Sequence, residues 1–127
     1  MIRIYGVREH LNPVKQQLSD AINECMAEAL SFPSDKRCQR FFPMEKEDCF
    51  YPVGRSDRYT VIEISMMEGR SPEARKRLIH LLFEKIEAKA GITSADVEIT
   101  IFESPACNWG FRGMTGDEAK LSYKVNV

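Results

Sequence analysis

The sequence predicts an α+β fold built from a duplicated strand–helix–strand unit, with a four-stranded core sheet and two helices on one face. Two observations predict this fold. Short segments alternate apolar and polar residues, as strands do, and two long segments space apolar residues three and four positions apart, as amphipathic helices do. The order of these segments repeats with an offset of about sixty residues, which indicates a duplicated unit.

The first unit covers about residues 1–45 and begins with a strand expected over Ile2–Val7. The dipeptide Asn12-Pro13 predicts a helix start, since asparagine caps helices and proline fits the first helical position. The apolar stripe of this helix continues to Leu30, and the segment SFPSD, which holds a proline, ends it. A second strand is expected over Arg37–Phe42.

The second unit covers about residues 58–113 and repeats this order. A strand is expected over Thr60–Met66, the dipeptide Ser71-Pro72 repeats the cap-and-proline start, and Gly91 is placed to stop the helix. The next strand is expected over Val97–Glu103. A strand, a crossover helix and a second strand most often form a parallel pair, so each unit predicts two parallel strands.

Two segments lie outside the units. Residues 43–57 are rich in proline and charge and are interpreted as a linker, either irregular or folded into a short hairpin. The alternation of apolar and polar residues from Leu121 to Val127 predicts a C-terminal strand with one apolar face. The whole chain, residues 1–127, is expected to form one domain.

Composition narrows the classes of function. The chain has 127 residues, 43% of them hydrophobic and 29% charged, with a formal net charge of −1. A nucleic-acid or anionic-membrane partner would favour a concentrated basic patch, so neither is expected. No apolar run is long enough to span a bilayer, and the amino terminus lacks the apolar core of a signal peptide. A cytoplasmic location is therefore expected.

The four cysteines form no zinc-binding pattern, and neither a metal nor an organic cofactor is expected. Cys25 lies on the apolar stripe of the first helix, and we expect Cys25 and Cys38 to be small core residues. Cys49 and Cys107 fall in predicted loops, where they can be exposed. No basic residues are arranged around either in a way that marks a nucleophile.

One face of the predicted sheet has no helix to cover it, whereas sheets with parallel strands are normally covered on both faces. The open face is expected to carry Arg3, Tyr5, Glu98, Thr100 and Phe102. We therefore expect other subunits to cover this face.

The turn EGRSP places Arg70 between a strand and the following helix. In α/β units ligands bind at this end of a strand, and a guanidinium grips a carboxylate through two parallel hydrogen bonds. Arg70 is therefore a candidate ligand-binding residue. The alternative is that Arg70 caps the turn or pairs with Glu68 or a neighbouring subunit.

The segment from Tyr59 to Gly113 resembles the short subunits of the 4-oxalocrotonate tautomerase family. It shares with them, in order, a strand ending in EGRS, a helix, the strand VEITIFE and an aromatic-glycine tail. The whole chain resembles longer members, in which two such units are fused. EKEDCFYPVGRSD and NWGFRGMTGDEA are similar to a tautomerase-like group without the amino-terminal proline. The resemblance implies a tautomerase/macrophage-inhibitory-factor-like fold and a homotrimer with the open sheet faces in its interior.

The resemblance also implies roles for individual residues. The family uses an amino-terminal proline as a general base that moves a proton α to a carbonyl. This chain begins with Met1 and has Thr60 at the equivalent position of the second unit. The Met1 α-amine, with a reference pKa of about 7.7–8.0, and Glu98, which stands where members often have arginine, are therefore candidate catalytic groups. Arg70 matches the carboxylate-binding arginine and Trp109 the aromatic wall, so both are candidate substrate-binding residues.

Each of these residues also has a structural interpretation. Trp109 can serve as a packing or interface aromatic, and Glu98 as an ion-pair partner at an interface. The first-unit positions equivalent to Arg70 and Glu98 hold His10 and Cys38, which do not reproduce the family pattern.

Two functions remain open. The first is a keto–enol isomerase, or an enzyme of related isomerisation, hydration or decarboxylation, that acts on a small carboxylate-bearing carbonyl compound with weak or altered chemistry. The second is a non-catalytic trimer that binds a small anion or has a regulatory role. A free Met1 amine near Arg70 would favour the first, and a Met1 paired into a sheet far from Arg70 would favour the second.

Overall fold

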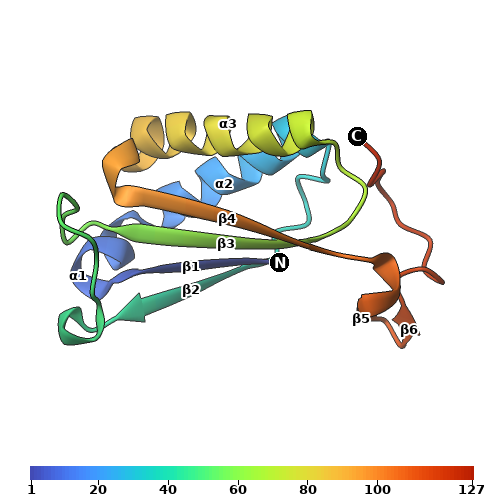
Figure 1. The fold of residues 1–127 in the computed structure, drawn as a ribbon, viewed down its shortest axis with the longest axis horizontal. Helices are drawn as coiled ribbons and strands as arrows, with labels where there is room; N and C mark the ends of the chain where they lie inside the picture. Colours follow the sequence, from blue (N-terminus) through green and yellow to red (C-terminus); the bar gives the residue numbers. More distant parts are fainter.

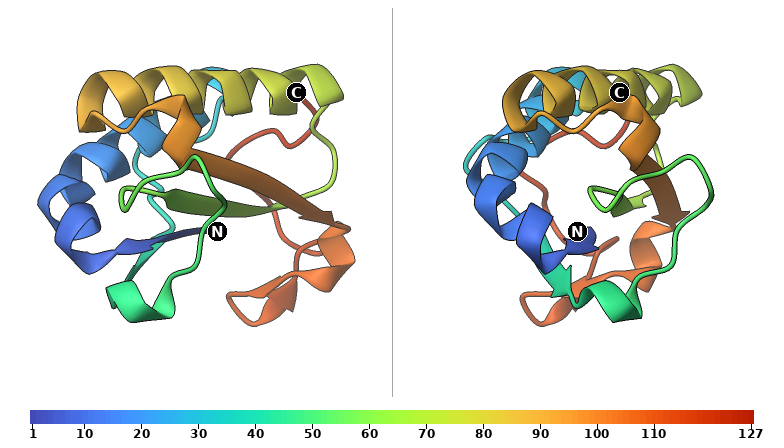
Figure 2. Two further views of the ribbon diagram at one scale, coloured as in Figure 1. Left: turned by 60° about the vertical axis from the view of Figure 1, so that its left-hand side comes forward. Right: turned by 90° about the vertical axis from the view of Figure 1, so that its left-hand side faces the viewer.

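The computed structural model describes residues 1–127 as a four-stranded sheet with two long helices side by side over one face, as Figure 1 and Figure 2 show. The predicted fold class is confirmed. The strands are β1 (Ile2–Val7), β2 (Gln39–Met44), β3 (Thr60–Met67) and β4 (Val97–Ser104), and the long helices are α2 (Lys15–Leu30) and α3 (Pro72–Ala90).

The strand order of the sheet is β2-β1-β3-β4. Each predicted unit forms a parallel pair, β1 with β2 and β3 with β4, and the two units join through an antiparallel pairing of β1 with β3. In that central pairing Ile2 lies opposite Ile64 and Ile4 opposite Ile62. The start of β1 therefore lies beside the end of β3.

The core lies between the helices and the sheet face to which every second strand residue points. Each fully buried leucine or isoleucine contributes about 1.5–3 kcal/mol relative to an exposed one. These side chains are Ile4, Leu11, Leu18, Ile22, Leu30, Ile62, Ile64, Leu78, Leu82 and Ile86. The alternation in the strands and the helical spacing together specify which face of each element is buried.

The predicted start and end of α3 are confirmed, but the predicted start of α2 is wrong. The Ser71 hydroxyl accepts a hydrogen bond of 3.1 Å from the Ala74 amide, and Gly91 ends the helix with φ of 71°. Before α2, the short helix α1 (Arg8–Leu11) and a 3₁₀ turn over 12–14 occupy the segment. The Asn12 side chain caps neither α2 nor the turn, because Asn12 already has helical dihedral angles.

The predicted C-terminal strand is also wrong. Residues 121–127 form no strand, although their apolar side chains are half-buried and their polar ones exposed, as the alternation predicts. Instead the tail runs back towards the start of α3, where the Ser71 amide donates a hydrogen bond of 2.9 Å to the Val127 carbonyl. A hairpin of β5 (Gly110–Phe111) and β6 (Met114–Thr115) precedes the tail. The linker over 43–57 contains a 3₁₀ turn and no hairpin.

The sheet face opposite the helices is left uncovered. Its aromatic residues Phe42 and Phe102 are 40% and 48% exposed. Arg3 lies on this face, 3.4 Å from Glu63 across the β1–β3 pairing, and also donates a hydrogen bond to Ser65. No helix is both long and apolar enough to cross a membrane.

Gly69 lies in the turn after β3, directly before Arg70, and replacing it with alanine should destabilise the protein. Gly69 has φ of 137°, and a Cβ there would lie 2.7 Å from Asn126 Oδ1 and 2.8 Å from Val125 Cγ1. The backbone strain alone costs about 1–3 kcal/mol, and the clash with the tail adds to it. Urea unfolding of Gly69→Ala measures the sum.

Gly54→Ala is the matched control, because Gly54 has φ of 95° with open space around the added Cβ. Gly69→Ala should lose more stability than Gly54→Ala. Equal losses would show that contact with the tail does not constrain the turn.

Candidate functional site

A cavity of about 650 Å³ lies at the end of the sheet where β3 ends and β1 and β2 begin. Figure 1 shows the amino terminus at this end of the sheet, on the side of the β5–β6 hairpin. The cavity wall combines segments far apart in sequence, including the amino terminus, the turn after β3 and the C-terminal tail. Its large apolar side chains include Met26, Phe32, Met66, Met67, Phe111 and Leu121.

Arg70 is the most unusual residue of this cavity. It is only 6% exposed, and its Nε has no hydrogen-bond partner. Its Nη1 donates a bond of 3.3 Å to the Met67 carbonyl, and the Tyr123 ring centroid lies 5.9 Å from the guanidinium carbon. Burial lowers the pKa of Arg70 from its ordinary value, because removal from water disfavours the charged form, while Tyr123 and Glu103 act in the opposite direction.

The position of Arg70 follows from the local sequence. Gly69 supplies the positive φ that reverses the chain after β3, and Ser71 caps α3 immediately afterwards. Arg70 is therefore held between a strand end and a capped helix, with no carboxylate within salt-bridge distance. A buried donor without a partner costs about 1–3 kcal/mol. A guanidinium kept in this condition is typical of a site that receives an anion.

Met1 lines the same cavity as Arg70. It extends the β1–β3 pairing by one residue, since its amine donates a hydrogen bond of 2.8 Å to the Ser65 carbonyl and its carbonyl accepts one of 2.8 Å from the Ser65 amide. The structure thus combines one feature expected of the isomerase with one expected of the non-catalytic trimer, because Met1 lies near Arg70 but is paired into the sheet. A neutral amine that donates one hydrogen to Ser65 still has its lone pair free to accept a proton.

The environment of the Met1 amine favours its neutral form. The residue as a whole is 42% exposed, yet burial of the amine is the main cause that lowers its pKa from the ordinary value of 8.0. The positive charges of Arg3, Arg70 and Arg40 lower this pKa further, and the neighbouring Cys38 side chain opposes them. A larger share of the amine is therefore unprotonated near neutral pH than for an exposed terminus.

Trp109 lines the cavity, and its indole Nε1 is buried without a partner. Gly116 holds the loop in place, because its amide donates a bond of 2.8 Å to the Trp109 carbonyl. A Cβ at Gly116 would lie 2.5 Å from the Ala106 carbonyl oxygen and 3.2 Å from Trp109 Cβ. This close packing holds the indole Nε1 of Trp109 beside the cavity, where it is a second donor without a partner, after Arg70 Nε.

The charges that line the cavity are all positive. Besides the Met1 amine and Arg70 they are Lys36, Arg37 and Arg112, and no aspartate or glutamate lines the cavity. Arg37 is partly neutralised by Asp20 outside the cavity, at 2.6 Å. Positive charge around a cavity with apolar walls favours a small ligand that has both an anionic and an apolar part.

Cys38 also lines this cavity, and the prediction that it is a core residue is wrong. Cys38 is exposed, whereas Cys25 is fully buried in the core as predicted. The amide of Ile2 donates a hydrogen bond of 2.9 Å to the Cys38 carbonyl, as the parallel pairing of Ile2 with Gln39 requires. Burial raises the pKa of the Cys25 thiol to about 12, so that thiol remains protonated.

Glu98 does not line this cavity. It pairs with Val61 near the start of β3, whereas Met1 pairs with Ser65 near the strand end, about 13 Å further along at about 3.3 Å per residue. Glu98 is exposed and lies beside Tyr59, whose pKa burial and this carboxylate raise to about 12. His10 also lies elsewhere, 4.0 Å from Asp57.

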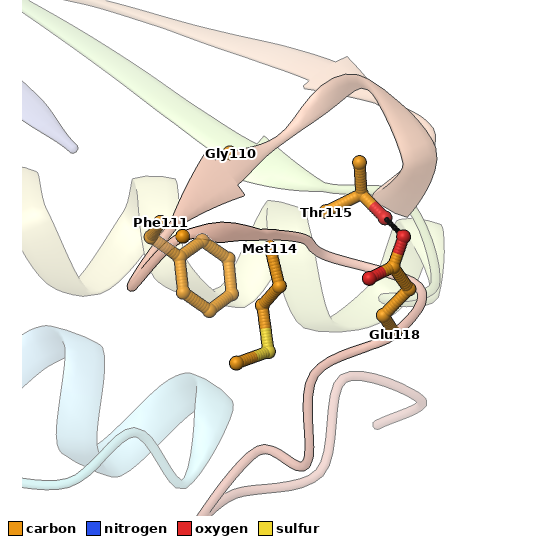
Figure 3. A pocket seen from close by; sticks show the side chains of 6 residues that line it. Gly110, Phe111, Met114, Thr115 and Glu118 are labelled. Carbon is orange, nitrogen blue, oxygen red and sulfur yellow. Dashed lines mark hydrogen bonds between the residues drawn. The ribbon is translucent and has the colours of Figure 1, made fainter.

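A second, shallow depression lies on the β5–β6 hairpin, where Figure 3 shows Phe111 and Met114 next to one another. Its one carboxylate, Glu118, already accepts a hydrogen bond of 2.7 Å from the Thr115 hydroxyl. No cationic side chain lines this depression. The chain also has no group of three or more metal-ligating side chains placed to hold an ion.

Sequence reasoning identified Met1, Arg70 and Trp109 but missed other residues of the cavity. Lys36, Arg37 and Cys38 precede β2, and Tyr123 belongs to the tail. The only sequence signal for the first group is the pair of basic residues directly before a cysteine. Their convergence depends on the pairing of β2 with β1 and on the path of the tail, which no local pattern encodes.

Comparisons with known proteins bear on the family and the fold of this chain. The sequence profile of the family described as "Tautomerase enzyme" matches residues 36–112. Probable tautomerase YusQ of Bacillus subtilis (strain 168) is 28% identical over 101 residues, which cover 76% of this chain and 80% of that protein. The 2-hydroxymuconate tautomerase of Comamonas testosteroni is 36% identical over 56 residues, which cover 44% of this chain and 89% of that protein. The solved R7 fused 4-OT, an asymmetric trimer, has a TM-score of 0.81 at 17% identity and covers 92% of this chain and 96% of that one.

The Met1 amine should titrate below 8.0, because burial and nearby positive charge disfavour its protonated form. The rate of acetylation at the α-amine, followed by peptide mass spectrometry across pH, measures this pKa because only the neutral amine reacts. In Arg70→Met the midpoint should move upward, since one positive charge is removed. A wild-type midpoint at or above 8.0 would contradict this account of the amine.

Proposed function

Since the chain belongs to the tautomerase family, we propose that it catalyses keto–enol isomerisation of a small carbonyl compound that carries a carboxylate. The observation that carries this proposal is the buried guanidinium of Arg70, which has an unpartnered Nε and faces a cavity lined by no acidic residue. A substrate carboxylate would supply the missing acceptor and the opposite charge.

The proposed chemistry needs a base beside the bound carboxylate. The neutral Met1 amine takes a proton from the carbon next to the carbonyl, and the resulting ammonium returns it to the other end of the enol system. Negative charge that develops on the carbonyl oxygen is stabilised by the cationic cavity. Trp109 restricts access of water on one side. Glu98 takes no part in this mechanism within one chain.

The amine's existing hydrogen bond supports a second candidate, a protein that binds small anions without catalysis. Met1 donates to the Ser65 carbonyl, and this bond stabilises the protonated amine that cannot act as a base. Both functions need Arg70. They differ in whether the amine exchanges a proton with the ligand.

Turnover of an enolic substrate tests the proposal. Phenylpyruvate and 2-hydroxymuconate are suitable, with enol-to-keto conversion followed by ultraviolet absorbance. Arg70→Met should lower kcat/KM by about 10–100-fold, because a charge-assisted hydrogen bond is worth about 1.5–3 kcal/mol. Its melting temperature should stay equal or rise, since the change removes a buried charge without a carboxylate partner. Wild-type kcat/KM should rise with pH through the Met1 pKa.

Arg55→Met is the matched control, because Arg55 is an exposed arginine outside the cavity. Turnover that is the same in wild type, Arg70→Met and Arg55→Met would contradict a role for Arg70. Binding of the keto acid without turnover would instead favour the non-catalytic candidate.

We further propose that three copies assemble into a homotrimer whose interior contains the uncovered sheet face. Support comes from the exposed aromatic residues Phe42 and Phe102 on that face and from the trimeric assembly of the structurally similar fused 4-OT. Exposed aromatic side chains are enriched in protein–protein interfaces.

Light scattering during size-exclusion chromatography tests the assembly. The wild-type mass should be three times that of the 14.6 kDa chain. Phe102→Asp should shift the protein towards monomer, because it buries a carboxylate in the interface. Val53→Asp should leave the trimer intact, since Val53 is a fully exposed apolar residue of the linker. A monomeric wild type would refute the proposal.

A further inference from the structure

Cys38 is a nucleophilic side chain in the cavity that the proposed isomerisation does not use. It precedes β2, the edge strand that pairs with β1 in the register Ile2 with Gln39. By that register Cys38 is the neighbour of Met1, on the opposite side from Ser65. Neighbouring strands lie about 4.7–4.9 Å apart, so the thiol and the α-amine belong to the same small region.

The surroundings of Cys38 differ from those of the other cysteines. Cys25 is fully buried in the core, Cys49 is half-buried, and Cys107 is exposed but lies outside the cavity. Among the cysteines only Cys38 is both exposed and part of the cavity lining. Cysteine is the most nucleophilic common side chain, and a neighbouring base that accepts its proton activates it.

Arg70 gives an independent indication of which class of ligand would lie next to this thiol. Its guanidinium is buried, lines the same cavity and keeps one donor without a partner. A ligand held there by a carboxylate would place its remaining atoms between apolar walls, near Met1 and Cys38. A carbonyl compound with a conjugated double bond has an electrophilic carbon that reacts with thiols.

We infer that Cys38 adds its thiol to α,β-unsaturated carbonyl compounds whose carboxylate is bound by Arg70. The neutral Met1 amine accepts the thiol proton, and the sulfur forms a bond to the alkene carbon β to the carbonyl. The π electrons of the alkene shift to give an enolate, and the Met1 ammonium then donates the proton to the α carbon. The sum is the addition of S–H across a C=C bond, with no oxidant, reductant or leaving group.

This inference shares Arg70 with the proposed isomerase but needs no enolisable substrate. The carboxylate site and the Met1 amine as proton carrier are common to both, whereas only the addition forms a new covalent bond, at the Cys38 sulfur. Covalent capture is therefore measurable even when isomerase turnover is absent.

The probe is trans-4-oxo-2-pentenoate, with its uncharged methyl ester as the control compound. Peptide mass spectrometry after timed incubation gives the labelling rate at each cysteine, and the adduct should add the mass of one whole probe molecule. The acid should label Cys38 at least about tenfold faster than Cys107, which corresponds to about 1.4 kcal/mol. The ester should show no such preference, and Arg70→Met should abolish the preference for the acid.

Cys38→Ser identifies the site. Because Cys38 is exposed, this variant should fold, and circular dichroism checks that it does. In this variant the rapid phase of labelling should disappear. The inference is overturned if the rapid adduct maps to Met1 or persists in Cys38→Ser. It is equally overturned if Cys38 reacts no faster than Cys107, or if acid and ester give the same preference. Loss of isomerase activity with retained capture would refute only the proposed function.

Discussion

The antiparallel pairing of β1 with β3 is the interaction on which the candidate site depends. It joins the two parallel pairs into one sheet and places Met1 beside Ser65, at the end of β3 that leads into the Arg70 turn. A shift of this register by one residue would turn the buried isoleucines of β1 towards the other face. The same apolar pattern that stabilises the core therefore also determines where the α-amine lies.

Arg70 shows how this arrangement relates to function. Burying a guanidinium without a carboxylate partner is unfavourable. The Met67 carbonyl accepts a hydrogen bond from Nη1, but Nε has no acceptor. A bound ligand that supplies the opposite charge offsets this loss of folding stability, and ligand-binding sites commonly lower the stability of the protein that carries them. The other cations of the cavity and the lowered pKa of the Met1 amine belong to the same electrostatic environment.

The sequence predicted those features that local chemistry determines. Ser71 and Gly91 delimit α3 because each satisfies a backbone requirement of a helix end, and the turn between a strand and that capped helix placed Arg70 correctly. The tail was predicted to be a strand because alternation reports which side chains face inward but not whether the backbone has a pairing partner. Cys38 was assigned to the core because burial statistics for cysteine do not reveal that its strand end borders a cavity.

The most direct test of the account is whether a carboxylate binds the Arg70 guanidinium. In ¹H–¹⁵N spectra of arginine Nε–H groups, the Arg70 signal is assigned by its absence in Arg70→Met, and phenylpyruvate is then titrated into the wild-type protein. The account predicts a saturable shift of the Arg70 signal, with the Arg55 signal unchanged, because the unpartnered Nε acquires an acceptor. Saturable binding that leaves the Arg70 signal unmoved would contradict it.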